Sequence, residues 1–268
     1  MLNTFRKAVE MNVSTREGRV TFGRDVFPVL RPTMLVEAKL RRITAASQMQ
    51  TRDDLRSKGE IGRIRATVLS VGNVHLHGEL YGDFLRSRKQ VFIDTKLWDL
   101  PQSEGMEFDQ YDTPQCQSIV LHEYGEVIAG IRILPTKARC GCYSYMLRDA
   151  QLGIIDTIPQ HVLYEEAPIA DNIWEATRLF ISPEVPAKRR ILVQSRLMQE
   201  MAAAAATQGA TYVVGIVPYV FRRWLERLGM GALPIGPKFT IGEDISQAAM
   251  IDVDTVGTSW DQNLTKYQ

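Results

Sequence analysis

From residue 64 onward, the apolar positions of the chain alternate between helix-like and strand-like spacing. Apolar residues recur at helical spacing in 78–92 and 187–207, which predicts two amphipathic helices, and a further helix is expected over 219–228. Short apolar or alternating runs predict strands, and these runs are 64–71, 118–122, 126–134, 173–181, 211–217 and 247–253. The turn at Glu123 joins two of these strands in a predicted hairpin. The segment 98–114 has no period and is expected to be a loop.

Strands and helices in this order predict a single α/β domain whose mixed, mostly antiparallel central sheet of six or seven strands is flanked by helices. The order alone leaves several topologies open. Residues 63–268 are predicted to form this domain. Residues 1–62 lack a long apolar period and are predicted to be an N-terminal extension.

The composition is that of an ordinary soluble globular protein, with 268 residues of which 45% are hydrophobic and 24% are charged. The longest nearly apolar runs, 201–206 and 212–217, are far shorter than the roughly 18 to 20 residues that cross a bilayer. The N-terminus lacks the apolar core of a secretion signal, so we expect a cytoplasmic protein without a membrane span. Three cysteines lack CxxC spacing and four histidines lack a ligand pattern, so neither disulfides nor a metal site is expected.

Positive charge is concentrated in the first quarter of the chain. The formal net charge of the whole chain is +1, but residues 1–70 contain 14 Lys and Arg against 7 Asp and Glu. A basic segment of this kind can contact nucleic acid or an acidic partner protein, although a solvated extension explains it more simply. We therefore expect no nucleic-acid partner.

Motifs of several common enzyme classes are missing from the sequence. GxSxG, GxxxxGK[ST], HExxH and GxGxxG do not occur, so serine hydrolase, P-loop and Rossmann interpretations lose their support. His75 and His77 lie two positions apart on a predicted strand or its end. A metal pair there would need further ligands that the sequence does not offer, which favours a structural or surface role.

Charged and aromatic residues are unusually dense between positions 88 and 132. The residues concerned are Arg88, Phe92, Trp98, Asp109, Asp112 and Arg132. The two acids can receive an ammonium group, the two aromatic rings offer their faces to a cation, and the two arginines can bind a carboxylate. Together these groups suit a small zwitterion that carries an additional positive charge. A solvated loop with local ion pairs is the alternative.

The spacing of these residues resembles that of the acyl-homoserine-lactone synthases, the autoinducer synthases of bacterial quorum sensing. The coinciding positions are Arg88-x3-Phe92-x5-Trp98-x10-Asp109-x2-Asp112, Arg132 in RILPT, and Glu175-x2-Arg178 in IWEATRLFIS. The resemblance runs from about residue 85 to 231, with a weaker tail to about 253. The basic extension has no counterpart in the short members of that family.

The resemblance implies a GNAT-like acyltransferase fold and a reaction between two substrates. S-Adenosylmethionine, a substrate and not a cofactor, supplies the homoserine part, and an acyl thioester supplies the chain, on acyl carrier protein in preference to coenzyme A. Glu175 is implied to be the general base that deprotonates the amine, directly or through a water, and Arg178 to pair with acids of the loop. The other six positions are implied to form the S-adenosylmethionine site or its supporting ion pairs.

Two other classes of function stay open at this stage. A related N-acyltransferase would acylate another amine, such as an amino acid, and would not need the whole loop that binds the sulfonium. A non-catalytic binding protein would act through the basic extension. The presence of Trp98, Asp109 and Asp112 favours the lactone synthase.

Two basic clusters are candidates for docking of the carrier protein. Generic acetyltransferases bind the coenzyme A pyrophosphate at a glycine-rich turn, whereas 181–190 contains no glycine, which favours a carrier-borne donor. The clusters are Lys188, Arg189 and Arg190, and then Arg222, Arg223 and Arg227 on the next helix. A solvated helix face is the alternative for both.

The acyl chain is expected to lie among apolar side chains. The candidates are Met146, Val213, Gly215, Val217, Val220 and Phe221, and an ordinary core position is the alternative for each. Members of the family that select 3-oxo chains tend to carry threonine where Gly215 aligns. Because glycine offers no hydroxyl, we expect an unsubstituted, 3-hydroxy, branched or aryl acyl group.

Overall fold

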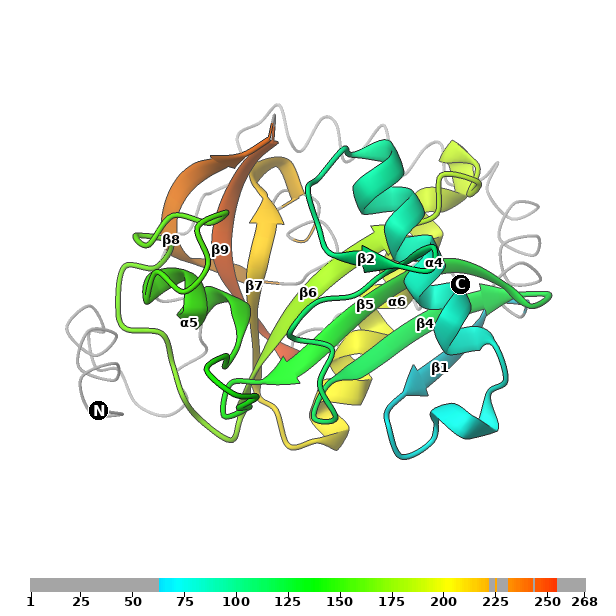
Figure 1. The fold of residues 1–268 in the computed structure, drawn as a ribbon, viewed down its shortest axis with the longest axis horizontal. Helices are drawn as coiled ribbons and strands as arrows, with labels where there is room; N and C mark the ends of the chain where they lie inside the picture. Colours follow the sequence, from blue (N-terminus) through cyan, green and yellow to red (C-terminus); the bar gives the residue numbers. More distant parts are fainter. Residues whose placement is uncertain (1–62, 222–224, 226–230, 243, 255–268) are drawn as a thin grey trace, which may run out of the picture. The chain divides into compact units, whose positions relative to one another are not determined.

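Seven strands form one sheet in the part of the chain that the computed structural model describes, which is residues 63–221, 225, 231–242 and 244–254. The strands are β1 (Arg65–Leu69), β4 (Gln117–Glu123), β5 (Glu126–Pro135), β6 (Ile173–Ile181), β7 (Tyr212–Pro218), β8 (Ala232–Ile241) and β9 (Asp244–Asp252). Their order across the sheet is β1-β4-β5-β6-β7-β9-β8 (Figure 1). A separate two-stranded ribbon is formed by β2 (Gln102–Ser103) and β3 (Met106–Glu107).

The sheet is mixed and mostly antiparallel, which confirms the predicted architecture. β6 and β7 are the parallel pair, and the other neighbouring strands of the sheet are antiparallel. Parallel strands need a crossover connection, which α6 (Ala187–Thr207) provides. The parallel ladder joins three residue pairs, the last of them Glu175 with Val214. The carboxylate singled out from the sequence therefore lies where this pairing ends.

Helices cover both faces of the sheet (Figure 1). Successive residues of a strand point to opposite faces, so Ile119 of β4 packs in the cluster that includes α6, and Val120 packs with Phe84 of α4 (Leu80–Lys89). α6 turns an apolar face to the sheet, formed by Val193, Leu197, Met198, Met201, Ala202 and Ala205. The two packed faces place one apolar core behind the sheet and a smaller one in front.

Several predicted elements coincide with the structure. The strand 173–181 and the helix 187–207 have the predicted bounds, and the predicted hairpin is β4 and β5. The last predicted strand, 247–253, overlaps β9 from residue 247 to its end at residue 252. The predicted helix 219–228 is helical at 219–221 and 225, and the rest of it lies outside the described residues.

Other predictions differ from the structure in detail, and two elements were missed. The predicted helix 78–92 is α4 followed by a wider π-helical turn, η3 (Gln90–Thr95), and the predicted loop 98–114 contains the ribbon of β2 and β3. β8 and the short helix α5 (Met146–Gln151) were not predicted. His75 and His77 lie at a 3₁₀ turn, η2 (Val74–Leu76), and not on a strand.

Some expectations concern absences or the extension. No group of three or more His, Cys, Asp or Glu among the described residues is placed to hold a metal ion. No described helix combines the length and the apolar character that a membrane crossing requires. The predicted extension, residues 1–62, lies outside the described residues.

Candidate active site

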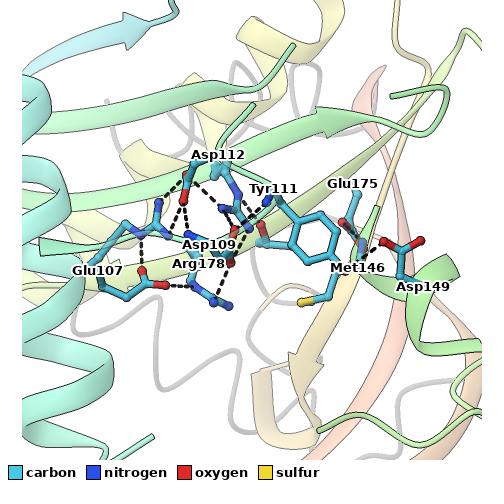
Figure 2. Close-up of polar contacts among 11 residues, drawn as sticks. Glu107, Asp109, Tyr111, Asp112, Met146, Asp149, Glu175 and Arg178 are labelled. Carbon is cyan, nitrogen blue, oxygen red and sulfur yellow. Dashed lines mark hydrogen bonds and ion pairs between the residues drawn. The ribbon is translucent and has the colours of Figure 1, made fainter. Parts of the chain in front are cut away.

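Three arginines and three acids form a buried ion-pair network on the front of the sheet (Figure 2). The members are Arg88 of α4, Glu107 of β3, Asp109 and Asp112 of the following loop, Arg132 of β5 and Arg178 of β6. Their side chains are 9% exposed or less. Four separate stretches of the chain, namely α4, β3 with the loop that follows it, β5 and β6, thus converge on one polar cluster with equal numbers of both charges.

Arg88 holds the ribbon and the loop together. Its Nε donates to Glu107 Oε2 at 2.5 Å, and its two terminal nitrogens donate to the two oxygens of Asp112 at 2.7 and 3.0 Å. This paired geometry is the strong form of an arginine–carboxylate contact. The backbone N–H of Asp109 also donates to Asp112, at 2.8 Å, which closes the loop on itself.

Arg132 and Arg178 complete the network from the sheet. Arg132 donates to both oxygens of Asp109, at 2.6 and 3.2 Å, and pairs with Asp112 at 2.9 Å. Arg178 pairs with Glu107 at 3.1 Å and with Asp109 at 2.7 Å. Burial alone would raise the pKa of Asp109, but Arg132 and Arg178 lower it below its ordinary value. Asp109 is therefore charged, and each acid of the network lies against at least one arginine.

The structure favours one of the two alternatives that the sequence left open. Asp109 and Asp112 could offer their carboxylates to a ligand's ammonium group and the arginines their guanidinium groups to a carboxylate, or these residues could form ion pairs with one another. In the structure these groups face one another, so they form the ion-pair support of the site. Glu107, which the sequence reasoning missed, bridges two of the arginines. The sequence could have indicated Glu107, because Glu107 and Asp109 are two positions apart and side chains at that spacing point to the same side of an extended segment.

Phe92 and Trp98 stack beside the network, with ring centroids 5.2 Å apart. Phe92 belongs to η3, and its carbonyl accepts the backbone N–H of Trp98 at 2.9 Å. The guanidinium of Arg178 lies 5.8 Å from the centre of the Phe92 ring. The π-helical turn therefore brings an aromatic pair against the charged cluster, a place where such turns often occur.

Arg178 occupies a bulge between β5 and β6. The pairing changes from Gly130 with Phe180 to Arg132 with Thr177, so the strand β6 contains an extra residue there. Arg178 has a φ of 56°, in the left-handed region that non-glycine residues rarely adopt. The distortion allows Arg178 to reach the acids of the loop.

Glu175 lies beside the network but is held by different partners. Its side chain is buried, and its two oxygens accept the backbone N–H groups of Met146 and Leu147, each at 2.8 Å (Figure 2). Burial raises the pKa of Glu175 to about 7, although the two backbone hydrogen bonds and Arg132 act in the opposite direction. A carboxyl group with this pKa exchanges a proton near neutral pH, as a general base must. Arg178, three positions further along β6, pairs with Glu107 and Asp109 and not with Glu175.

An apolar cavity of about 40 Å³ lies between the sheet and α6. Among its lining residues are the predicted Val213, Gly215, Val217 and Phe221, together with Met198 and Met201 of α6. Two predicted members lie elsewhere. Met146 begins α5 on the Glu175 side, and the side chain of Val220 is 76% exposed.

The first predicted basic cluster is partly used within the chain. Arg189 pairs with Glu123 at 3.1 Å, and Arg190 donates to the carbonyls of Ser182 and Val185. Lys188 is exposed. The second cluster, Arg222, Arg223 and Arg227, lies outside the described residues.

Known proteins resemble this chain over most of the described range. Residues 73–259 match the family model described as autoinducer synthase. The acyl-homoserine-lactone synthase of Acinetobacter nosocomialis is 28% identical over 181 residues, which are 65% of this chain and 92% of that protein.

Two solved structures have the same fold. The acyl-homoserine-lactone synthase LasI is 22% identical with a TM-score of 0.62, and the likeness covers 73% of this chain and 93% of LasI. BjaI, a coenzyme A-dependent acyl-homoserine-lactone synthase whose structure contains S-adenosylmethionine and isopentyl-CoA, is 21% identical with a TM-score of 0.60 over 74% of this chain and 89% of BjaI. These likenesses confirm the predicted GNAT-like α/β fold.

Proposed function

The chain belongs to the autoinducer synthase family, and from that premise we propose that it makes an N-acyl-L-homoserine lactone from S-adenosylmethionine and an acyl thioester. The observation that carries the proposal is Glu175, a buried carboxyl group whose pKa is raised to about 7 beside a charge-matched polar cluster. Acylation of an amine needs a group that accepts a proton near neutral pH, and Glu175 is suited to that role.

The first step is acyl transfer to nitrogen. Glu175 accepts a proton from the ammonium group of S-adenosylmethionine, directly or through a water, and the free amine attacks the thioester carbonyl. A C–N bond forms, the C–S bond of the thioester breaks, and the thiol of the donor leaves with a proton. Each oxygen of Glu175 accepts one backbone N–H, and a carboxylate has about four acceptor positions, so a position remains for the proton.

The second step closes the lactone ring. The methionyl carboxylate attacks the γ-carbon, an O–C bond forms, and the bond from that carbon to the sulfonium breaks to release methylthioadenosine. The sulfonium is already a good leaving group, so correct orientation of the carboxylate supplies most of the catalysis. The ion-pair network fixes the loop and strands around the site, and the half-buried Trp98, which stacks on the buried Phe92, offers aromatic surface for a cation.

The cavity behind the sheet is proposed to take the acyl chain. Its lining includes apolar side chains of α6 and β7 and the backbone of Gly215. A side chain at position 215 would begin 2.6 Å from the carbonyl oxygen of Ala176, too close for an unchanged backbone. A threonine therefore cannot occupy position 215 unless the strands move apart. Because family members that select 3-oxo chains tend to carry threonine at this position, the close approach supports an acyl group without a 3-oxo function.

We propose acyl carrier protein as the preferred donor, with coenzyme A as the alternative. The turn after β6 contains no glycine, and the exposed Lys188 offers a positive charge to an acidic carrier surface. Turnover measured with matched acyl-carrier-protein and acyl-CoA donors decides between the two.

Mass spectrometry of organic extracts from cells that express the chain tests the proposed function. The expected result is an acyl-homoserine lactone, whose mass also gives the acyl length. An acylated amino acid without a lactone would instead indicate the related N-acyltransferase. Cells that express Glu175→Gln at the same level are the matched control and are expected to lack the product.

A further inference from the structure

We propose that Asp149 and Tyr111 are positioning residues for Glu175, in that they fix the start of α5 and tether it to the acidic loop. This inference rests on the proposed function of Glu175 as the base. Both residues act through the backbone of α5, which holds the Glu175 carboxyl group (Figure 2).

The position of Glu175 depends on the position of α5. Both of its oxygens are bound to the first two residues of that helix, Met146 and Leu147. The helix has six residues, and its N-cap residue, Tyr145, makes no side-chain capping hydrogen bond. A helix this short is not stable by itself, so contacts from outside must set its place.

Asp149 supplies one such contact. It is fully buried, and its carboxylate accepts the backbone N–H of Ser144 at 2.9 Å and also the Ser144 hydroxyl. The carboxylate thus folds back over the first turn and holds the chain that enters α5. An acid near a helix N-terminus also interacts favourably with the backbone dipoles there.

Tyr111 connects Asp149 to the ion-pair network. Its hydroxyl donates to Asp149 Oδ2 at 3.0 Å, and its backbone N–H donates to Asp109 at 2.9 Å. The guanidinium of Arg132 lies 5.7 Å from the centre of the Tyr111 ring. Burial and the nearby Asp149 raise the pKa of Tyr111 above its ordinary value, so the hydroxyl remains a donor. The loop and α5 therefore share one rigid connection.

Asp149 also acts on Glu175 through its charge. Four groups face Glu175 from the surrounding elements, and these are Arg132 of β5, Asp149 of α5, Tyr145 before that helix and Tyr111 of the loop. Asp149 is the acid among them, and its negative charge favours the protonated form of Glu175. Removal of that charge should make Glu175 ionise at lower pH.

Carbon-13 NMR of protein labelled at the glutamate side-chain carboxyl carbon tests the charge effect. Glu175→Gln identifies the resonance by its loss. In Asp149→Asn, the midpoint of the Glu175 titration is expected to fall by about 0.5 to 1 pH unit. Asp156→Asn removes the same charge from an exposed position and should leave the midpoint unchanged. A midpoint equal to that of the unaltered protein in Asp149→Asn would overturn the proposal.

Tyr111→Phe tests the tether without changing any charge, and it decides the question if Asp149→Asn does not fold. The expected result is a kcat about three- to tenfold lower, with KM for S-adenosylmethionine within about twofold, because a displaced base slows chemistry more than binding. An unchanged kcat would refute the tether. The NMR titration needs no turnover, so a shifted midpoint in a protein that makes no lactone would support the positioning role and refute the proposed function.

Discussion

At the scale of single residues, Glu175 is a buried carboxyl group whose pKa is raised by burial, and two backbone N–H groups partly offset that rise. The first prediction concerns its replacement by glutamine, which has nearly the same shape but cannot accept a proton. Turnover should fall by roughly 10² or more, the usual scale for a lost general base, and S-adenosylmethionine affinity should stay within a few fold. Release of methylthioadenosine and calorimetry measure the two quantities. Unchanged turnover would show that Glu175 is not the base.

Asp112 gives the second prediction. Its carboxylate receives two hydrogen bonds from Arg88 and pairs with Arg132, so Asp112→Asn leaves buried positive charge without a matching partner. The free energy of unfolding should fall by about 3 to 5 kcal/mol, and S-adenosylmethionine binding should weaken more than acyl-donor binding. Urea unfolding and calorimetry check both effects.

The control for Asp112 is an acid in an exposed pair. Asp83 contacts Arg86 at 2.7 Å, and both side chains are at least 41% exposed. Asp83→Asn should cost less than about 1 kcal/mol. An equal decrease in the free energy of unfolding in the two variants would show that a buried ion pair of the network stabilises the fold no more than an exposed pair does.

At the scale of elements, the sequence predicts the helices and strands whose apolar residues keep a helical or strand spacing over their whole length. β6 and α6 have the predicted bounds because each carries a full strand or helix pattern. β8 was missed because Pro234, Gly236 and Pro237 interrupt it, and proline is tolerated there because β8 is the last strand of the sheet.

In the site as well, local sequence patterns identify residues but do not show which distant residues they contact. The spacing and the resemblance that it carries were enough to select Glu175 and five of the six residues of the network, but Glu107 was missed, and the partners of these residues come from elements far apart in the chain. α5 is too short to show a period, and contacts with Glu175 and Asp149 determine where it begins. Asp109 pairs with Arg132 and is not free to bind a ligand. This contact depends on how the loop packs against the sheet, which no local sequence pattern shows.

The close approach of Gly215 in β7 to β6 leads to the third prediction. Gly215 follows the last paired position, and a methyl group there would lie 2.6 Å from the Ala176 carbonyl oxygen. Gly215→Ala should lower the free energy of unfolding by about 1 to 3 kcal/mol, because the strands must separate. Gly72→Ala is the control, since the nearest atom to its new methyl is 3.7 Å away, and it should change stability by less than about 0.5 kcal/mol. Equal stabilities of the two variants would contradict the close approach.

At the scale of the whole molecule, the raised pKa of Glu175 makes stability depend on pH, which is the fourth prediction. The folded protein holds the Glu175 proton up to about pH 7, whereas the unfolded chain releases it near 4.5. The free energy of unfolding should therefore decrease as pH rises through this window, by about 3 kcal/mol from this group. Urea unfolding at pH 5 and pH 7.5 measures the change.

Comparison with Glu175→Gln isolates that contribution. The lowered pKa of His122 has the opposite effect in the same range, but it is common to both proteins. The lowered pKa values of Asp109 and Asp112 stabilise the folded protein at pH values above the pKa that these groups have in the unfolded chain. This stabilisation is lost only at more acidic pH. Identical pH dependence in the two proteins would show that Glu175 ionises normally.

The fifth prediction concerns the extension, which stays a prediction from the sequence. The described core begins with Ile64, whose side chain is 5% exposed, and β1 follows directly. Deletion of residues 1–59 should leave a folded enzyme that produces lactone. Soluble expression and product mass spectrometry check this. Loss of soluble protein would show that the extension completes the core, and a salt-sensitive rise in KM for the carrier substrate would show that its basic residues recruit the donor.

The charge balance of the network also bears on how such an enzyme can evolve. Three arginines and three acids share one buried cluster, so exchange of any single member leaves an unmatched charge in the interior. Descendants of this sequence can alter the residues of this cluster only by coordinated double changes, which are rare. The side chains of the cavity beside α6 are neutral and apolar, and they can be exchanged one at a time at modest cost. New signal molecules should therefore arise by variation of the acyl chain, while the homoserine half of the product is inherited unchanged.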